Sequence, residues 1–397
     1  MSGVRDFLTL PTVRAGNPAA IARALVRLPS VNPSLDEDGC GEGDVANFCY
    51  ELLDGWGLEV HRREVAPGRP NVVARMYGEG PALLLNGHLD TVGVGGMVVE
   101  PFAGALSADD DHEPTLFGRG SCDMKGGIAA ILGATARLAR SDSPRPNLIV
   151  ALTVDEEHAS LGMSHLIDSG VRAEMAVVCE PTGLAVAPAH KGFVWAAVEF
   201  GGVAAHGSRP DLGIDAIRNA GEYLAGLESL HADLSAREPH PLLGIPSFHA
   251  GTIHGGSADS IYPESCVLTL ERRTLPGEAP EIFLRELDEA ASGLRSAGHR
   301  VTIRQTLARP ATETPVDSAL TQGLLAALRR CGIDDRVASM SAWVDAAFLN
   351  QAGIPAVCFG PGDIALAHTA AESVPVREIE DCARVLEEFA GNLTAWS

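Results

Sequence analysis

Several features that mark membrane, nucleic-acid-binding or secreted proteins are absent from this sequence of 397 residues. No apolar run approaches the ~20 residues that a membrane-spanning helix requires, and the N-terminal apolar stretch is too short and broken for a secretory signal. Basic residues are scarce, because 30 Lys and Arg stand against 52 Asp and Glu, a formal net charge of −22. This charge would repel a phosphate backbone or an anionic lipid surface, so we expect neither nucleic acid nor membrane as a partner.

Paired cysteines are also missing. The eight cysteines are scattered and form no C-x-x-C pair, which disfavours a thiolate zinc cluster and indicates reduced, mostly buried thiols in a cytoplasmic protein. Neither repeats nor low-complexity tracts occur. A content of 46% hydrophobic and 21% charged residues is typical of a globular chain, and the length favours two domains.

Strand and helix signals alternate through the first half of the chain. Short apolar runs such as 82–86 are typical of strands buried on both faces. Strands interleaved with helices predict an α/β fold with a largely parallel sheet that helices cover on both sides. The predicted strands are 57–63, 71–77, 82–86, 147–154 and 175–179, and the predicted helices are 17–28, 44–56 and 126–138.

The pattern changes between about residues 192 and 305, where a strand-helix-strand-helix-strand order predicts a small sheet with helices on one face. After Pro310 the first pattern returns, with a strand at 355–359. The sequence therefore predicts a larger domain of residues 1–191 and 307–397 and an inserted, smaller α+β (ferredoxin-like) domain of residues 192–306. The elements predicted in the insert are strands 193–200, 266–273 and 299–304 and helices 214–227 and 281–294.

Residues that can bind a metal follow several predicted strands. His88 and Asp90 share one face of a strand, so Asp90 can hold one ring nitrogen while the other binds a metal. Asp123 opens a helix at the position of the third glycine of a dinucleotide loop, where a carboxylate would repel a pyrophosphate. Each residue also has a simpler interpretation, as a hydrogen-bonded histidine or a helix N-cap.

Glu156 and Glu157 directly follow another predicted strand, Glu180 follows a third, and His368 lies beyond a fourth. A solvated loop would explain the adjacent glutamates; the alternative is one metal ligand and one general base. Open α/β sheets bind ligands at the carboxyl ends of their strands. Two histidines and several carboxylates without cysteine suit a hydrolytic zinc site, in which a carboxylate can bridge two ions ~3.5–4 Å apart.

These motifs and their order resemble the acetylornithine deacetylase and succinyl-diaminopimelate desuccinylase family of dinuclear metallohydrolases, which also includes aminoacylases and glutamate carboxypeptidases. The resemblance covers roughly positions 86–368, and the domain layout fits the whole chain. The motifs that carry it are GHLDTV (87–92), GRGSCDMKGG (118–127), DEE (155–157), EPT (180–182), AHGS (205–208) and the segment from Gly360 to His368.

The resemblance implies roles for these residues and two divalent ions, zinc first, with cobalt or manganese as alternatives. Asp123 would bridge the ions, Asp90 would orient His88, and Glu156 would be the general base. Glu156 would take a proton from a metal-bridged water that attacks the amide carbonyl, and return it to the leaving amine. The implied ligands are His88, Asp123 and Glu180 for one ion and Asp123, Glu157 and His368 for the other.

The resemblance also implies that the inserted domain recognises substrate and makes a homodimer. His206 would reach the partner chain's active site and stabilise the oxyanion, although without the resemblance an ordinary loop histidine would be the better interpretation. Arg273 falls where the family carries an arginine that can bind the substrate carboxylate. Ser260 stands where the family often has Asn, so contacts to the substrate there are expected to differ.

We therefore expect a metal-dependent amidohydrolase that acts on a small N-acyl-L-amino acid, with N-acetylornithine or a related compound as the first choice. A dipeptidase or carboxypeptidase of the same family is the alternative. A catalytically inactive binding protein on the same scaffold is disfavoured, because the set of ligands and the base is complete.

Overall fold

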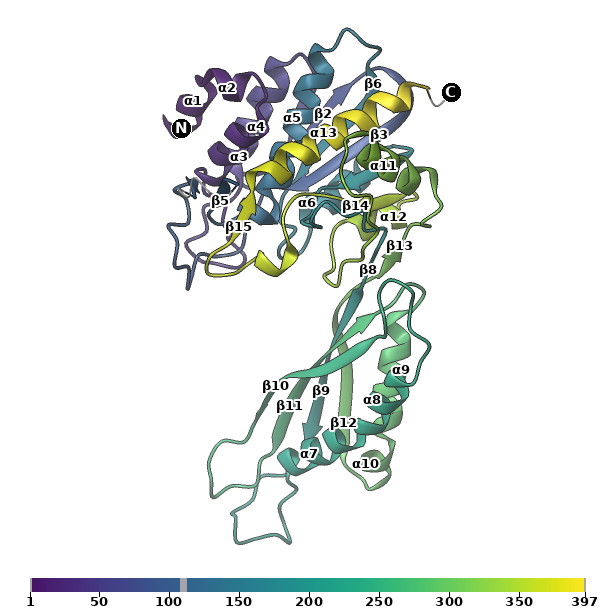
Figure 1. The fold of residues 1–397 in the computed structure, drawn as a ribbon. Coiled ribbons are helices and arrows are strands. Elements are labelled where there is room, and N and C mark those ends of the chain that lie inside the picture. Colours follow the sequence, from purple (N-terminus) through teal and green to yellow (C-terminus); the bar gives the residue numbers. More distant parts are fainter. Residues whose placement is uncertain (1, 108–112, 396–397) are drawn as a thin grey trace. The chain divides into compact units, whose positions relative to one another are not determined.

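The computed structural model of the chain describes residues 2–107 and 113–395 (Figure 1). The chain divides into two compact units. The predicted boundaries at 191/192 and 306/307 fall inside the second unit, because β8 (Ala189–His190) pairs with β13 (Thr312–Glu313) and both belong to it. The first unit comprises Met1–Pro188, Thr314–Ser339 and Val344–Ser397, and the second comprises Ala189–Glu313 and Met340–Trp343.

A six-stranded sheet of order β1-β2-β6-β3-β7-β14 forms the centre of the first unit. The last four strands of this order run parallel, whereas β1 and β2 form an antiparallel hairpin at one edge. The prediction of a largely parallel sheet is confirmed, and its buried apolar runs reflect cover on both faces. The strands are β1 (Glu59–Ala66), β2 (Arg69–Met76), β3 (Glu79–His88), β6 (Pro146–Thr153), β7 (Met175–Val178) and β14 (Ala356–Cys358).

Helices pack on this sheet through apolar faces. In α13 (Val376–Asn392) the buried positions recur at helical spacing from Ile379 to Phe389. The small residues of α5 (Gly126–Arg140) allow close packing, since a Cβ at Gly127 would lie 2.1 Å from the carbonyl oxygen of Cys179. This approach brings the start of α5 against the end of β7. The other helices are α1 (Ser2–Leu8), α2 (Pro11–Arg14), α3 (Pro18–Val26), α4 (Gly43–Gly55), α6 (Leu161–Asp168), α11 (Ala319–Arg330) and α12 (Ala346–Gln351).

Short strands and turns complete the first unit, and several of the loops discussed below begin or end at them. A three-stranded sheet of order β15-β5-β4 pairs segments that are far apart in the sequence. The remaining elements are β4 (Ala105–Leu106), β5 (Thr115–Phe117), β15 (Ser373–Pro375), the π-type turn η1 (Ser121–Lys125), and the 3-10 turns η2 (Ile364–Leu366) and η3 (Leu393–Ala395).

The second unit is a four-stranded antiparallel sheet of order β10-β11-β9-β12 with helices packed against it. Along the chain it reads β-α-β-β-α-β, the ferredoxin-like order. Its core includes Phe200, Tyr223 and Phe283. The elements are β9 (Gly192–Gly201), α7 (Ala216–Gly226), α8 (Glu228–Ser235), β10 (Ser247–Gly255), β11 (Ser265–Thr274), α9 (Pro280–Ala290), α10 (Ser292–Ser296) and β12 (Arg300–Arg309).

The sequence did not predict β10 or α8 as separate elements. β10 is an edge strand that is exposed along almost its whole length and lacks an alternating apolar pattern. α8 buries only Leu234 and has a weakly apolar face. Among the described residues, none of the helices is both long enough and apolar enough to span a bilayer.

Candidate metal centre

The predicted metal ligands of the first unit converge at the carboxyl ends of its parallel strands. His88 is the last residue of β3, Glu157 follows β6, and Glu180 follows β7. Asp123 lies in η1, and His368 lies in the segment after β14. Parallel strands place their carboxyl ends on the same edge of a sheet, so residues that are far apart in the sequence meet there.

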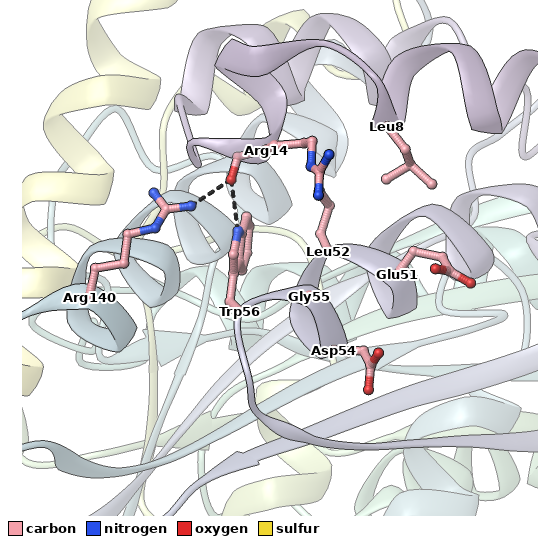
Figure 2. Close-up of a pocket in the computed structure, with 8 residues that line it drawn as sticks. All are labelled: Leu8, Arg14, Glu51, Leu52, Asp54, Gly55, Trp56 and Arg140. Carbon is pink, nitrogen blue, oxygen red and sulfur yellow. Dashed lines mark hydrogen bonds between the residues drawn. The ribbon is translucent and has the colours of Figure 1, made fainter.

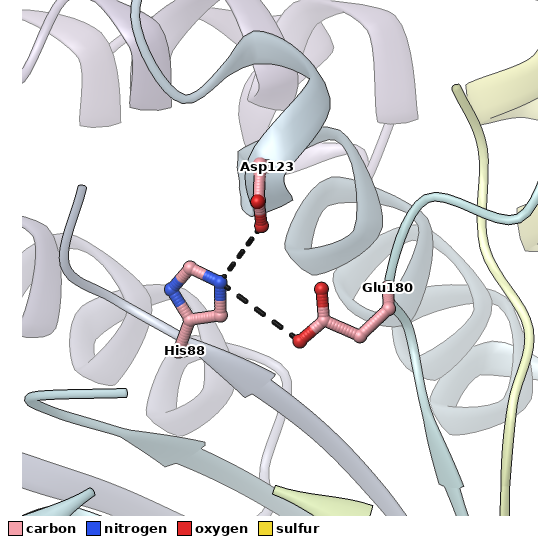
Figure 3. Close-up of side chains that lie close together, drawn as sticks. All are labelled: His88, Asp123 and Glu180. Carbon is pink, nitrogen blue, oxygen red and sulfur yellow. Dashed lines mark hydrogen bonds and ion pairs between the residues drawn. The ribbon is translucent and has the colours of Figure 1, made fainter. Parts of the chain in front are cut away.

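The first donor set consists of His88, Asp123 and Glu180, whose ligand atoms all lie within 4.8 Å of one another (Figure 3). His88 Nε2 is 3.0 Å from Asp123 Oδ1 and 3.9 Å from Glu180 Oε1. All three residues are at least nine-tenths buried, with 2%, 7% and 2% of their surface exposed. The set is therefore enclosed by protein on nearly every side.

The second donor set consists of Asp123, Glu157 and His368. His368 Nε2 is 3.1 Å from Glu157 Oε2 and 3.4 Å from Asp123 Oδ2. Because Asp123 turns Oδ1 toward His88 and Oδ2 toward His368, its carboxylate can bridge two ions. The His368 side chain is 48% exposed, so this set opens toward solvent.

The chemistry of both sets fits divalent metal ions. Imidazoles and carboxylates are the donors that zinc, cobalt and manganese accept. Glu180 Oε1 is buried and accepts no hydrogen bond from any described residue, and such an atom requires a partner. Burial first, and then the charge of Asp123, raises the pKa of Glu180 well above its usual value. A cation between these carboxylates would remove this cost of ionisation.

The charges within the centre are strongly coupled. Hydrogen bonds to Asp123 and Glu157 raise the pKa of His368 to about 10. Burial acts against ionisation of Asp123, but hydrogen bonds from His368 and His88 outweigh it, so the pKa of Asp123 is lowered. Without a metal, protonated imidazoles would therefore supply the positive charge that these carboxylates need.

Asp90 connects His88 to the loop that carries the adjacent glutamates. Its Oδ1 accepts the backbone N–H of Glu156 and its Oδ2 accepts that of Glu157, both at 3.1 Å. His88 Nδ1 lies 3.0 Å from the Asp90 carbonyl oxygen and 3.6 Å from its Oδ1. Asp90 therefore contacts His88 chiefly through its backbone carbonyl, and its carboxylate fixes the backbone of both glutamates.

Glu156 belongs to neither donor set, although it directly precedes Glu157. Burial raises its pKa well above the usual value for a glutamate. A carboxylate that is adjacent to a metal centre, is not itself a ligand and has a raised pKa can carry a proton at neutral pH.

A buried ionic network behind these glutamates was not singled out from the sequence. Arg69 Nη2 lies 2.6 Å from Glu42 Oε1 and 2.9 Å from Asp155 Oδ1. Asn32 Nδ2 donates to Asp155 Oδ1 and to Asp90 Oδ2. Asp155 has φ +69°, a conformation that few residues other than glycine adopt, and these partners hold it there. The local sequence does not distinguish Arg69, because β2 also contains Asn71 and Arg75.

The residues expected to contact substrate lie in the second unit. His206 Nδ1 is 2.8 Å from Ser208 Oγ, and the backbone N–H of Gly207 donates to the carbonyl of Ser260 at 2.7 Å. Arg273 lies at the other end of β11, where its Nε donates to Glu271 Oε1 at 2.7 Å. His206 and Ser260 are thus neighbours, whereas Arg273 is separate from them.

A cavity of about 620 Å³ elsewhere in the first unit contains none of these donors. There the carbonyl of Arg14 accepts hydrogen bonds from Trp56 Nε1 and from Arg140 (Figure 2). Both contacts tie the C-terminal end of α2 to the helices beside it. This cavity therefore does not mark the metal centre. The cavity is lined by Leu8, Arg14, Glu51, Leu52, Asp54, Gly55, Trp56 and Arg140.

A mixed α/β unit with two histidine- and carboxylate-rich donor sets at its strand ends defines a metal-dependent hydrolase. Residues 84–392 match the peptidase family M20/M25/M40. The chain is 31% identical to an acetylornithine deacetylase of Myxococcus xanthus, over 96% of this chain and 99% of that protein. It is 31% identical to an acetylornithine deacetylase of Pectobacterium carotovorum, over 92% and 95%. The chain therefore belongs to peptidase family M20/M25/M40 and is a metal-dependent amide hydrolase.

Solved structures show the same fold at low sequence identity. A tripeptidase from Staphylococcus aureus has a TM-score of 0.79 at 21% identity, covering 96% of this chain and 99% of that one. A dinuclear metal binding peptidase from Bacillus subtilis has a TM-score of 0.74 at 17% identity, covering 97% and 99%. An M20 family metallo-carboxypeptidase from Sulfolobus solfataricus has a TM-score of 0.75 at 18% identity, covering 96% and 99%.

Proposed function

We propose that this chain removes the acyl group from an N-acyl-L-amino acid, with N-acetylornithine as the first candidate substrate. The observation that carries the proposal is the pair of donor sets that share Asp123, with Glu156 beside them and outside both. The similarity to acetylornithine deacetylases over nearly the whole chain supports the choice of substrate.

Two divalent ions, zinc in our proposal, would be held by the two donor sets and would lower the pKa of a water and polarise the amide carbonyl. The Glu156 carboxylate accepts the proton that this water loses as it attacks the carbonyl. Its raised pKa suits it to return the same proton to the leaving amine nitrogen. Asp90 keeps both glutamates in place through their backbone N–H groups, so that Glu157 remains a ligand while Glu156 exchanges a proton.

We also propose that the second unit forms a homodimer and completes the site. β10 has a strand partner along only one edge among the described residues, and an exposed edge of this kind can pair with a second copy. Exposed apolar side chains of the same unit support this assignment. They include Val203, Leu212, Ile214, Ile217, Ile253 and Ile261. Within such a dimer, His206 would donate to the oxyanion, Arg273 would bind the substrate carboxylate, and Ser260 would contact the substrate.

The eight cysteines are all free, and most are buried. Unpaired thiols persist in a reducing compartment. This observation supports our placement of the enzyme in the cytoplasm.

The test is a substrate panel assayed with purified, metal-loaded protein. Release of free amine would be measured with N-acetylornithine, N-succinyl-diaminopimelate, several N-acetyl amino acids and a set of dipeptides. The Glu156→Gln variant, prepared in parallel, controls for contaminating hydrolases. We expect the largest kcat/KM with N-acetylornithine or a related acetyl amino acid.

A dipeptidase or carboxypeptidase is the second candidate, and the peptidases among the structural neighbours favour it. Faster turnover of dipeptides than of every acyl amino acid would replace the first proposal with this one. Absence of amine release from the whole panel would overturn both.

A further inference from the structure

A buried carboxylate that belongs to neither donor set joins two of the three loops from which the second donor set is built. Glu372 is four residues beyond His368 and directly precedes β15. β15 pairs with β5, and β5 leads into the segment that carries Asp123. The two loops therefore meet although about 250 residues separate them, and Glu372 is fully buried where they meet, with 0% of its surface exposed.

Both oxygens of Glu372 are occupied. Its Oε1 accepts the backbone N–H of Cys122 at 3.0 Å and that of Asp123 at 3.1 Å. Its Oε2 accepts from Arg119 Nη1 at 2.5 Å. Arg119 is itself 2% exposed, and its Nε donates to the carbonyl of Gly93. Hydrogen bonds of this charge-assisted kind are the strong and geometrically specific ones.

This arrangement makes Glu372 unsuitable as a metal ligand but suitable for positioning one. Its oxygens face backbone N–H groups and a guanidinium, and Arg119 balances its charge, so it adds no net negative charge to the centre. Through the backbone of Asp123 it fixes the carboxylate that both donor sets share. Because only three residues separate Glu372 from His368, the same contacts restrict the position of the exposed histidine of the second set.

We infer that Glu372, held by Arg119, is a positioning residue that sets the distance between Asp123 and His368 and thereby the affinity of the second metal site. The inference rests on the proposed two-metal function. Its effect should be unequal, because the first set keeps His88 and Glu180 on strand ends that Glu372 does not contact. In the second set, only Glu157 follows a strand that Glu372 does not contact. Partners behind ligands of this kind typically change metal affinity by about 10- to 100-fold.

Two variants test separately the position and the charge of the Glu372 carboxylate. Glu372→Asp keeps the charge but shortens the side chain by one methylene, so it cannot reach the N–H groups and Arg119 together. The double variant Glu372→Gln with Arg119→Gln removes both charges without leaving either buried alone, while an amide oxygen remains to accept the N–H groups. Glu113→Gln is the matched control, because it breaks an exposed ion pair with Arg377 that lies on the surface.

The experiment is a titration of the metal-free full-length chain with Co²⁺, followed by absorption spectroscopy and calorimetry, with metal content measured by mass spectrometry. Circular dichroism melts verify that each variant is folded.

We expect the wild type and Glu113→Gln to bind two ions. We expect Glu372→Asp to bind the first ion within about threefold of the wild type and the second about 10- to 100-fold more weakly. The kcat of Glu372→Asp should fall when metal is limiting, and excess metal should restore this kcat by mass action. KM should be nearly unchanged. The double variant should lie between Glu372→Asp and the wild type.

Equal weakening of both ions in folded Glu372→Asp would overturn the inference, because it would indicate general damage. Unchanged binding of both ions would overturn it as well. If the wild type itself binds a single ion, the two-metal function fails first and the inference fails with it, so the two failures are told apart by the wild-type titration.

Discussion

The two units present their candidate residues in opposite ways. In the first unit, five predicted metal donors from distant parts of the chain come together in two sets, and most of them are buried. In the second unit, His206 and Ser260 lie on an exposed loop region, and Arg273 is paired with its neighbour Glu271. The fold of the first unit thus brings its candidate residues together, whereas the fold of the second unit leaves Arg273 apart from His206 and Ser260.

This difference sets the size of the effects that substitutions should produce. Charges in the buried centre depend on one another, and removing one leaves the others uncompensated. Exposed pairs such as Arg209–Asp211 are solvated and contribute little to stability. Changes in the first unit should therefore abolish chemistry. Changes in the second unit should produce smaller losses that depend on dimerisation or on substrate concentration.

Metal removal should have the largest effect. Complete chelation should abolish activity, and the chain should remain folded, because an extended sheet and a large core hold the first unit together without the ions. Residual activity, metal content and a circular dichroism melt check this, and added Zn²⁺ should restore turnover. Activity that persists at zero measured metal would contradict the metal assignment.

Glu156→Gln comes next, with an expected loss of about 10²- to 10⁴-fold in kcat. The amide keeps the shape of the side chain but cannot accept and return a proton. Both ions should remain bound, because Glu156 is outside both donor sets. The matched variant Glu157→Gln, one residue further on, should instead lose metal from the second set. Near-normal turnover of Glu156→Gln would show that another group is the base.

The contrast between the buried residues of the first unit and the exposed residues of the second also explains what could be predicted from the sequence. β3 and β6 of the first unit contain buried apolar runs, so their ends could be placed, and the donors that follow such strands could be expected to meet. Apart from Asp90, the partners of those donors could not be predicted. The contact between Arg119 and Glu372 joins residues 253 positions apart, and nothing in either local sequence indicates it. β10 of the second unit was not predicted, because an exposed edge strand buries too few side chains for apolar and polar residues to alternate along it.

His206→Ala tests whether the second unit of one chain completes the site of another. Losing one oxyanion donor costs about 10²- to 10³-fold in kcat, and the ions should stay bound. Mixing this variant with Glu156→Gln subunits should recover activity, because one site of each mixed dimer then has an intact base and an intact donor. His61→Ala, which removes an exposed histidine paired with Glu59 in the first unit, is the control. Verified mixed dimers without recovery would place His206 outside the partner's site.

Arg273→Ala should produce the smallest effect and should appear mainly in KM. The Arg273 side chain is 35% exposed, and its guanidinium is bound to Glu271 and lies 5.5 Å from the centre of the Phe193 ring. A substrate carboxylate must therefore compete with Glu271, which reduces the net gain from binding. We expect KM to rise about 10- to 100-fold with kcat and metal content nearly unchanged, about 1.4 kcal/mol for each tenfold step.

Two further variants make the Arg273 prediction sharper. Arg273→Lys should recover only part of the loss, since an ammonium lacks the planar fork that binds a carboxylate through two hydrogen bonds. Arg304→Ala breaks an exposed pair with Glu199 on the same sheet and should leave KM unchanged. Steady-state kinetics with one substrate across all three variants check this. If Arg273→Ala matches Arg304→Ala in both KM and kcat, Arg273 serves only its contacts with Glu271 and Phe193, and the substrate carboxylate is bound elsewhere.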